Sequence, residues 1–102
     1  MLKVMSLMRK KEGMSFADFK RWAEQEHPKF AMKIPGMEAY RMNVCLTENP
    51  DGPCDAVSEM WFQNEAAMAA GFSTDAGKAA GADATAHCAH RTRLMLTETV
   101  VR

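Results

Sequence analysis

The segment at residues 2–9, LKVMSLMR, carries apolar side chains at both alternating sets of positions. A strand of this kind must be covered on both faces, so the pattern predicts a strand in a sheet that packs against something on each side. Residues 37–46, 56–63 and 93–101 predict three further strands, again with apolar groups on both faces. Any fold for this chain must therefore bury both faces of one sheet.

A helix is expected between the first two strands. Ser15 is a natural N-cap, and Asp18 three residues later makes an aspartate version of the capping box. Pro28 disfavours helical geometry at the preceding residue, so we expect the helix to kink or end there and Pro28 to open a second short turn. Apolar side chains and one histidine share a face at helical spacing: Phe16, Phe19, Ala23, His27 and Phe30.

The stretch after the third strand predicts two helices. Asn64 can cap a short helix over residues 65–70, which Gly71 ends. Ser73 can cap a longer one over roughly residues 74–89. The longer helix is rich in alanine but contains two glycines, so its stability must come from packing.

The expected order is β-α-β-β-α-β over one domain, residues 1–102. Two right-handed split β-α-β units give a four-stranded antiparallel sheet with both helices on one face, which is a ferredoxin-like α+β fold. The second sheet face is then uncovered although it is apolar. A second copy of the same sheet would cover it, so we expect a homodimer that forms a barrel through the sheet face.

Composition and charge narrow the class of protein. Thirteen basic side chains balance thirteen acidic ones, which leaves no basic field for nucleic acid or an anionic membrane. No apolar run approaches the ~20 residues that span a bilayer, and the amino-terminal run MLKVMSLMRKK lacks the order of a secretory signal. Three cysteines without a C-x-x-C spacing suit a reduced, cytoplasmic protein.

His27 is the principal candidate for chemistry. It ends the apolar helix face and should point inward, where a neutral imidazole can take and give protons. Tyr40 follows the Pro35-Gly36 turn on a strand that passes back near this helix, so it could hold an enolate or phenolate oxygen. The alternative is that His27 caps the helix by donating to a backbone carbonyl and that Tyr40 is part of the core.

Ten methionines suit an interior that accepts bulky apolar ligands, although each one alone is more often core filler. The candidates for the walls of such a pocket are Trp61, Met42, Met60, Trp22 and His90. Which of the strand residues among them contribute depends on which strand face meets the helices.

The run His87-Cys88-Ala89-His90 would place its two histidines three apart on a helix, roughly on one face. Two such ligands can begin a metal site, but nothing in the sequence completes it. Rim histidines without a metal are therefore the favoured interpretation. Glu59 and Glu98 lie inside expected strands and either pair with Arg9, Arg41 or Arg93 or face the dimer cavity.

Short motifs along essentially the whole chain resemble the EthD family. In chain order they are Arg9-Lys10-Lys11-Glu12-Gly13-Met14-Ser15 with Phe19 and Trp22, His27-Pro28, Pro35-Gly36 with Tyr40, Ala56 through Phe62, Ser73 through Ala82-Asp83, and the strand bearing Glu98. The resemblance implies a dimeric α+β barrel without a cofactor, in a group that includes methylmuconolactone methylisomerase and polyketide cyclases. It also implies that His27 sits where the methylisomerase branch has a pocket histidine. Met60 departs from that branch, which has a cysteine there.

The leading functional hypothesis is a cofactor-independent lyase or isomerase for a lactone, phenolic or polyketide-like intermediate, with His27 as general acid or base. A non-enzymatic alternative is an accessory protein that binds an apolar, aromatic-derived metabolite for a monooxygenase system. The founding member of the resembled family is an accessory protein of an ether-degrading monooxygenase system. Related barrels bind haem through a histidine, which is a third reading that a Soret band would reveal; we expect none.

Overall fold

A computed structural model describes residues 1–102. The elements are β1 (Leu2–Lys10), α1 (Phe16–Arg21), the π-helical turn η1 (Trp22–Glu26), α2 (His27–Ala31), β2 (Ala39–Val44), β3 (Ala56–Phe62), α3 (Glu65–Phe72), α4 (Asp75–His87) and β4 (Cys88–Thr97). The strands form one antiparallel sheet in the order β2-β3-β1-β4. This confirms the expected ferredoxin-like α+β fold.

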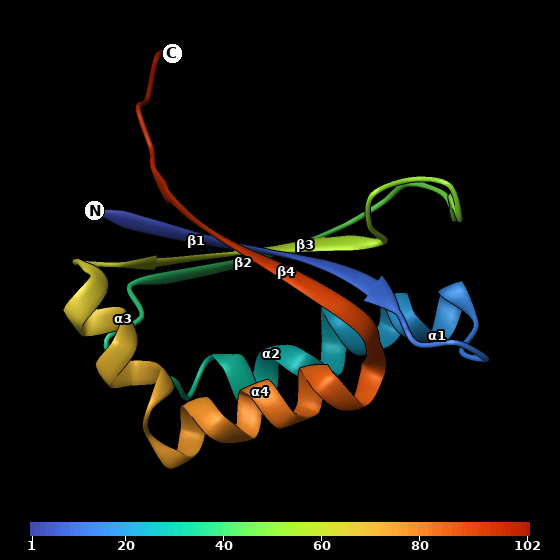
Figure 1. Ribbon diagram of the computed structural model, residues 1–102, viewed down its shortest axis with the longest axis horizontal. Helices are drawn as coiled ribbons and strands as arrows, with labels where there is room; N and C mark the ends of the chain where they lie inside the picture. The colour runs from blue at the N-terminus through green and yellow to red at the C-terminus, as the bar shows by residue number, and fades with distance from the viewer.

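All the helices lie on one side of the sheet (Figure 1). Along β1 the side chains of Val4, Ser6 and Met8 are buried toward the helices, whereas Met5 and Leu7 point to the other face and are only partly covered. The core between sheet and helices has two apolar clusters. The first surrounds Phe19 and Trp22 and consists of Met8, Phe19, Trp22, Ala23, Ala56, Ala84 and Cys88. The second surrounds Phe62 and Ile34 and consists of Val4, Ile34, Met60, Phe62 and Ala80. No helix combines the length and apolar character needed to cross a membrane.

The helical stretch does not end before Pro28 but widens there into a π-helical turn, and Pro28 lies in the first turn of the short helix α2, as expected. The backbone N–H of His27 donates to the carbonyl of Trp22, five residues earlier, so the chain makes a π-helical turn just before α2. A proline inside an α-helix lacks an N–H and crowds the carbonyl four residues earlier. The wider turn accommodates this without stopping the helix.

This wider turn also corrects the expected helix face. Phe30 is 39% exposed, and Ala31 is buried in its place, because the extra residue in the turn shifts the inward direction by one position. At the start of the helix, Ser15 accepts from the N–H of Asp18 at 3.0 Å as expected. The Asp18 carboxylate does not complete a reciprocal box but pairs with Arg21 at 3.1 Å.

Other boundaries differ where tertiary pairing overrides local pattern. Thr74, not Ser73, caps α4 by accepting from the N–H of Gly77 at 3.1 Å, and α3 runs through Gly71 to Phe72. The strand expected at residues 93–101 begins at Cys88, since β1 extends far enough to pair with it.

Two glycines of α4 have opposite surroundings. A Cβ on Gly77 would lie 2.4 Å from the carbonyl oxygen of Gly71 and 2.6 Å from the backbone of Phe72, so α3 and α4 approach each other through this missing side chain. A Cβ on Gly81 would meet nothing within 4 Å. Gly77 is therefore required by packing, whereas the space beside Gly81 could hold a methyl group.

We predict that Gly81→Ala raises the free energy of unfolding by ~0.5–1 kcal/mol, because alanine is the better helix former and fits the open space. Gly77→Ala should lower it by ~1–3 kcal/mol, because the backbone of α3 must move. Urea unfolding followed by circular dichroism measures both. Equal effects of the two substitutions would show that the α3–α4 approach is not tight.

Candidate functional site

A half-buried carboxylate of α4, that of Asp83, holds His27. The Nδ1 atom of His27 lies 2.9 Å from Oδ2 of Asp83, and the indole Nε1 of Trp22 donates to the same oxygen at 3.0 Å. Trp22 begins the π-helical turn and His27 begins α2, so one carboxylate ties both to the helix that packs beside them. The orientation of the imidazole is thereby set by a residue that is distant in sequence.

Aromatic packing encloses this pair. The ring of Trp22 lies with its centroid 4.9 Å from that of His27 and 4.7 Å, stacked, from that of His87. His87 in turn donates from Nδ1 to the backbone carbonyl of Asp83 at 2.7 Å. His27 is only 7% exposed. The imidazole of His27 therefore has little freedom to turn.

Burial lowers the pKa of His27 below its ordinary value. The hydrogen bond and the charge of Asp83 oppose this shift, while Arg91 and His87 add to it. The imidazole is thus neutral at pH 7. An ionised carboxylate only accepts hydrogen bonds, so Nδ1 carries the proton and Nε2 keeps its lone pair. A neutral imidazole held by a carboxylate in this way is the arrangement of a general base.

A cavity of about 310 Å³ opens beside His27, between the helices and the sheet. Its wall has an apolar part, with Ile34, Met60 and Phe72, and a cationic part, with Arg91 and Arg93 from β4. A base, an apolar surface and guanidinium groups therefore border one space. Such a combination is typical of a small-molecule site.

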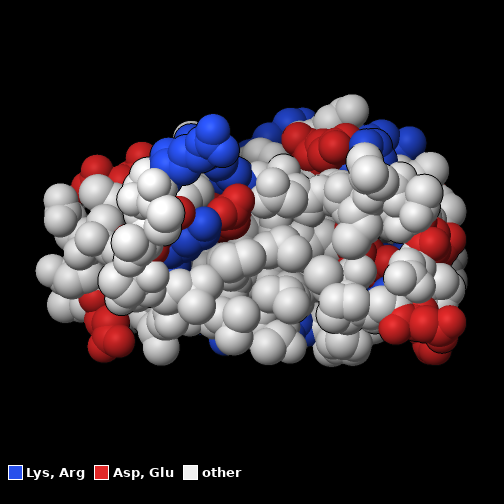
Figure 2. Space-filling model, turned by 90° about the horizontal axis from the view of Figure 1, so that it is seen from above, with Lys and Arg blue, Asp and Glu red and all other residues white.

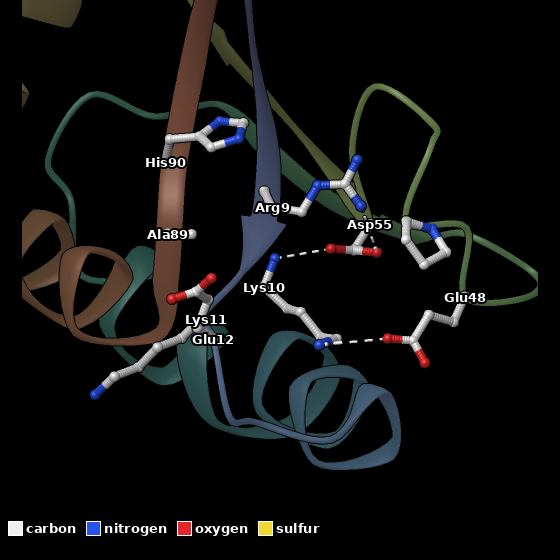
Figure 3. Close-up of a pocket in the computed structure, with 9 residues that line it drawn as sticks. Arg9, Lys10, Lys11, Glu12, Glu48, Asp55, Ala89 and His90 are labelled. Atoms are coloured by element: carbon white, nitrogen blue, oxygen red, sulfur yellow. Dashed lines mark hydrogen bonds and ion pairs between the residues drawn. The ribbon is translucent and has the colours of Figure 1, made fainter.

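A larger hollow, about 730 Å³, lies at the far end of β1 and has a polar wall (Figure 3). Its charges are mostly paired with one another: Arg9 contacts Asp55 at 3.2 Å, and Lys10 contacts Glu48 at 3.3 Å. Asp55 is almost fully buried and also accepts from the N–H of Lys10 at 2.8 Å. These contacts anchor the loop between β2 and β3, so we assign this hollow to structure and take the cavity at His27 as the candidate site.

The candidate residues from the sequence separate into three places. Met60 lines the cavity with His27, and Trp22 packs against the imidazole. Met42 and Tyr40 also face the helices but belong to the core, and neither lines the cavity. The hydroxyl of Tyr40 is buried without a hydrogen-bond partner, and burial raises its pKa.

Trp61 and His90 project from the other face of the sheet, because they pair across the ladder with Lys3 and Arg9. His90 borders the polar hollow of Figure 3. The expected helical cluster of His87 and His90 is wrong, since α4 ends at His87 and the later histidine lies on a strand. The chain holds no group of three or more potential metal ligands.

The expected ion pairs of the two strand glutamates are corrected as well. Lys3, not an arginine, bridges both: its Nζ lies 2.5 Å from Glu59 and 3.0 Å from Glu98. Trp61 lies beside them, with its Nε1 3.4 Å from Glu98 and the Lys3 ammonium 5.0 Å from its ring centroid. This group is on the sheet face away from the helices.

Three residues of the site were missed from the sequence alone: Asp83, Arg91 and Arg93. Asp83 precedes His87 by one helical turn in an alanine-rich segment, which was a usable sign of a shared helix face. Arg91 and Arg93 alternate, and once a strand begins at Cys88 they share a face. Because the strand was expected to begin only at residue 93, the sequence did not place Arg91 on the same strand face as Arg93.

Comparison with known proteins places the chain in a family. The EthD domain profile matches residues 11–90, and the chain belongs to the EthD family. No curated protein matches it.

Solved structures share the fold over nearly the full chain. An ethyl tert-butyl ether D (EthD) family protein from Bacillus halodurans C-125 has a TM-score of 0.79 at 24% identity, covering 97% of this chain and 99% of that one. A dimeric ferredoxin-like protein of unknown function from Thermobifida fusca YX has a TM-score of 0.76 at 16% identity, covering 95% and 90%. An Arabidopsis thaliana protein has a TM-score of 0.76 at 16% identity, covering 100% and 99%.

The lowered pKa of His27 predicts acid sensitivity. The unfolded chain titrates this group near about 6.5, so below that pH the unfolded state binds the extra proton first and the free energy of unfolding falls. Burial is the main cause of this shift; Arg91 from β4 and His87 from α4 add to it, and Asp83 from α4 opposes it. Urea unfolding at roughly pH 7.5 and 5.5 should show the loss.

The matched variants are His27→Gln, which should reduce the loss of stability between the two pH values, and His90→Gln, which should retain it because His90 is exposed on the other face. An unchanged pH dependence in His27→Gln would contradict the assignment of this titration to His27.

Proposed function

We propose that this EthD-family chain is a cofactor-independent lyase or isomerase that acts on a lactone, phenolic or polyketide-like intermediate, with His27 as the general acid and base. The observation that carries the proposal is the neutral imidazole of His27, oriented by Asp83 at 2.9 Å and bordering a partly apolar cavity. A histidine that only caps the helix would donate its hydrogen bond to a backbone carbonyl. His27 donates instead to the carboxylate of Asp83, which stabilises the imidazolium that forms when the base takes up a proton.

The chemistry follows from these contacts. Nε2 of His27 takes a proton from a carbon next to a carbonyl group of the substrate, and the electron pair of that C–H bond becomes an enolate. Asp83 then faces an imidazolium and stabilises it through the hydrogen bond it already makes. Return of the proton to another carbon of the enolate completes an isomerisation. In an elimination the enolate re-forms its carbonyl, a C=C bond forms, and the bond from the β-carbon to the leaving group breaks; the departing group takes its electron pair and receives the proton from His27.

Tyr40 has no part in this proposal. Its side chain does not line the cavity, and its raised pKa keeps the hydroxyl protonated within the core. Met60 and Trp22 are retained, the first as apolar wall and the second as the group that holds Asp83 and packs on the imidazole.

We also propose that the chain forms a homodimer through the sheet face opposite the helices. Figure 2 views this face and shows an uncharged area across its centre with acidic and basic side chains around it. Met5, Leu7, Val57 and Leu94 are directed to this side by the strand register. Leu94 is 40% exposed, and the Thermobifida fusca relative is described as dimeric.

Proton transfer can be tested without knowing the physiological substrate. Exchange of the C–H beside the carbonyl into deuterium oxide, followed by proton NMR, should be accelerated with α-angelica lactone or benzoylacetone as probe. His27→Gln should slow the enzymatic exchange by ~10²-fold or more, and Asp83→Asn should also slow it. The rate should fall as the pH drops through the lowered pKa of His27.

His90→Gln is the control and should exchange at the wild-type rate. An unchanged rate in His27→Gln would refute the proposal. Probe binding that alters protein NMR signals without any exchange would instead support the accessory-protein alternative.

The dimer is tested by light scattering on a sizing column. Leu94→Glu places a charge in the uncharged area of the sheet face and should convert the dimer to a monomer. Leu46→Glu is the matched control, because Leu46 is fully exposed in a loop. A wild-type monomer, or a Leu94→Glu variant that remains dimeric, would exclude this face as the interface.

A further inference from the structure

Two arginines of β4 point to the same side as His27. Arg91 pairs across the ladder with Met8 and Arg93 with Ser6, and both of these β1 residues face the helices. Arg91 and Arg93 accordingly line the cavity beside His27. They also border, with Ser6 of β1, an adjoining hollow of about 350 Å³.

Neither guanidinium has an acidic partner. Arg91 donates to the hydroxyl of Thr85 at 2.9 Å and approaches the carbonyl of Gly81 at 3.5 Å. Arg93 lies over the ring of Phe72, with 4.5 Å between its Cζ atom and the ring centroid. By contrast, Arg9 and Arg21 each contact a carboxylate, at 3.2 and 3.1 Å. The two cavity arginines therefore retain donors for an anion.

The charges around the cavity are unbalanced. Lys78, Arg91 and Arg93 line it, and no aspartate or glutamate does, although the chain as a whole is neutral. Burial lowers the pKa of Arg93, and the nearby charge of Arg91 lowers it further. An anion between them would relieve this repulsion and give each guanidinium a charged hydrogen-bond partner.

We propose that the substrates of this site are small apolar carboxylic acids, whose carboxylate is bound by Arg91 and Arg93 while the apolar body lies against Ile34, Met60 and Phe72. This inference rests on the proposed function. It narrows the substrate class from neutral lactones and phenols to lactones and phenols that also bear a carboxylate group. The planar guanidinium matches a carboxylate with two parallel hydrogen bonds, which a point charge such as Lys78 does not provide.

A bound anion also acts on the base. Arg91 contributes to the lowered pKa of His27, and a carboxylate paired with Arg91 neutralises that effect. The imidazolium formed by proton abstraction is then less costly. Binding of an acid should therefore raise the pKa of His27, whereas binding of a neutral analogue should not.

The matched probes are 1-naphthylacetate and 1-naphthylacetamide, which have nearly the same shape and differ in charge. Binding is measured by the chemical shifts of the His27 ring protons in titrations at pH 7.5 and low salt, and the pKa of His27 is read from pH titrations with each probe. We expect the acid to bind about tenfold tighter or more than the amide and to raise the pKa of His27. Inorganic phosphate alone should compete only weakly, because it lacks the apolar body.

Arg93→Gln and Arg91→Gln should each reduce the preference for the acid, and the double variant should abolish it. Arg21→Gln is the matched control, since Arg21 is exposed on α1, pairs with Asp18 and lies outside the cavity lining. Equal binding of acid and amide to the wild type, binding of neither at millimolar concentration, or an acid preference that survives in the double variant would overturn the proposal.

The two proposals fail in different ways. A site that binds the acid selectively through Arg91 and Arg93 but does not exchange protons refutes the catalytic role of His27 alone. A site that exchanges protons in neutral lactones but shows no preference for the acid refutes the carboxylate subsite alone.

Discussion

The carboxylate of Asp83 is the contact on which the rest of the site depends. It accepts from the indole of Trp22 and from the imidazole of His27 at one oxygen atom, so a single carboxylate connects α4 with the π-helical turn and with the start of α2. Without it, both donors would be left buried without a partner, which costs ~1–3 kcal/mol for each such group. The tautomer of His27, its direction toward the cavity and the wall formed by α4 all follow from this connection.

Much of the fold was predictable because it depends on local alternation. Apolar residues on both strand faces required a sheet with two covers, and turn and capping residues placed the elements in the order observed. The inward direction of His27 also follows from helical spacing, which is a local property. Ser15 and Asn64 cap their helices as their side chains suggest.

The remainder depends on contacts between distant segments. Alternation shows that Met60 and Trp61 lie on opposite faces of β3, but only the packed helices decide which of them meets the cavity. Because β4 pairs with β1 from Cys88 onward, the strand begins earlier than the local pattern predicts. His87 is therefore the last residue of α4 and His90 lies on β4, so the two do not share a helix face. The role of Asp83 as hydrogen-bond acceptor for His27 depends on the packing of α4 beside α2, which local sequence does not reveal.

The π-helical turn at Trp22–Glu26 has a consequence for how such a site could arise. Residues five apart do not share a face of an α-helix, yet here the rings of Trp22 and His27 are in contact, because the turn contains one residue more than an α-helical turn. A single-codon insertion into an ordinary amphipathic helix would produce this change. In evolutionary terms, one added residue in an existing helix is enough to bring an indole against a histidine that ordinary helical spacing already directs inward.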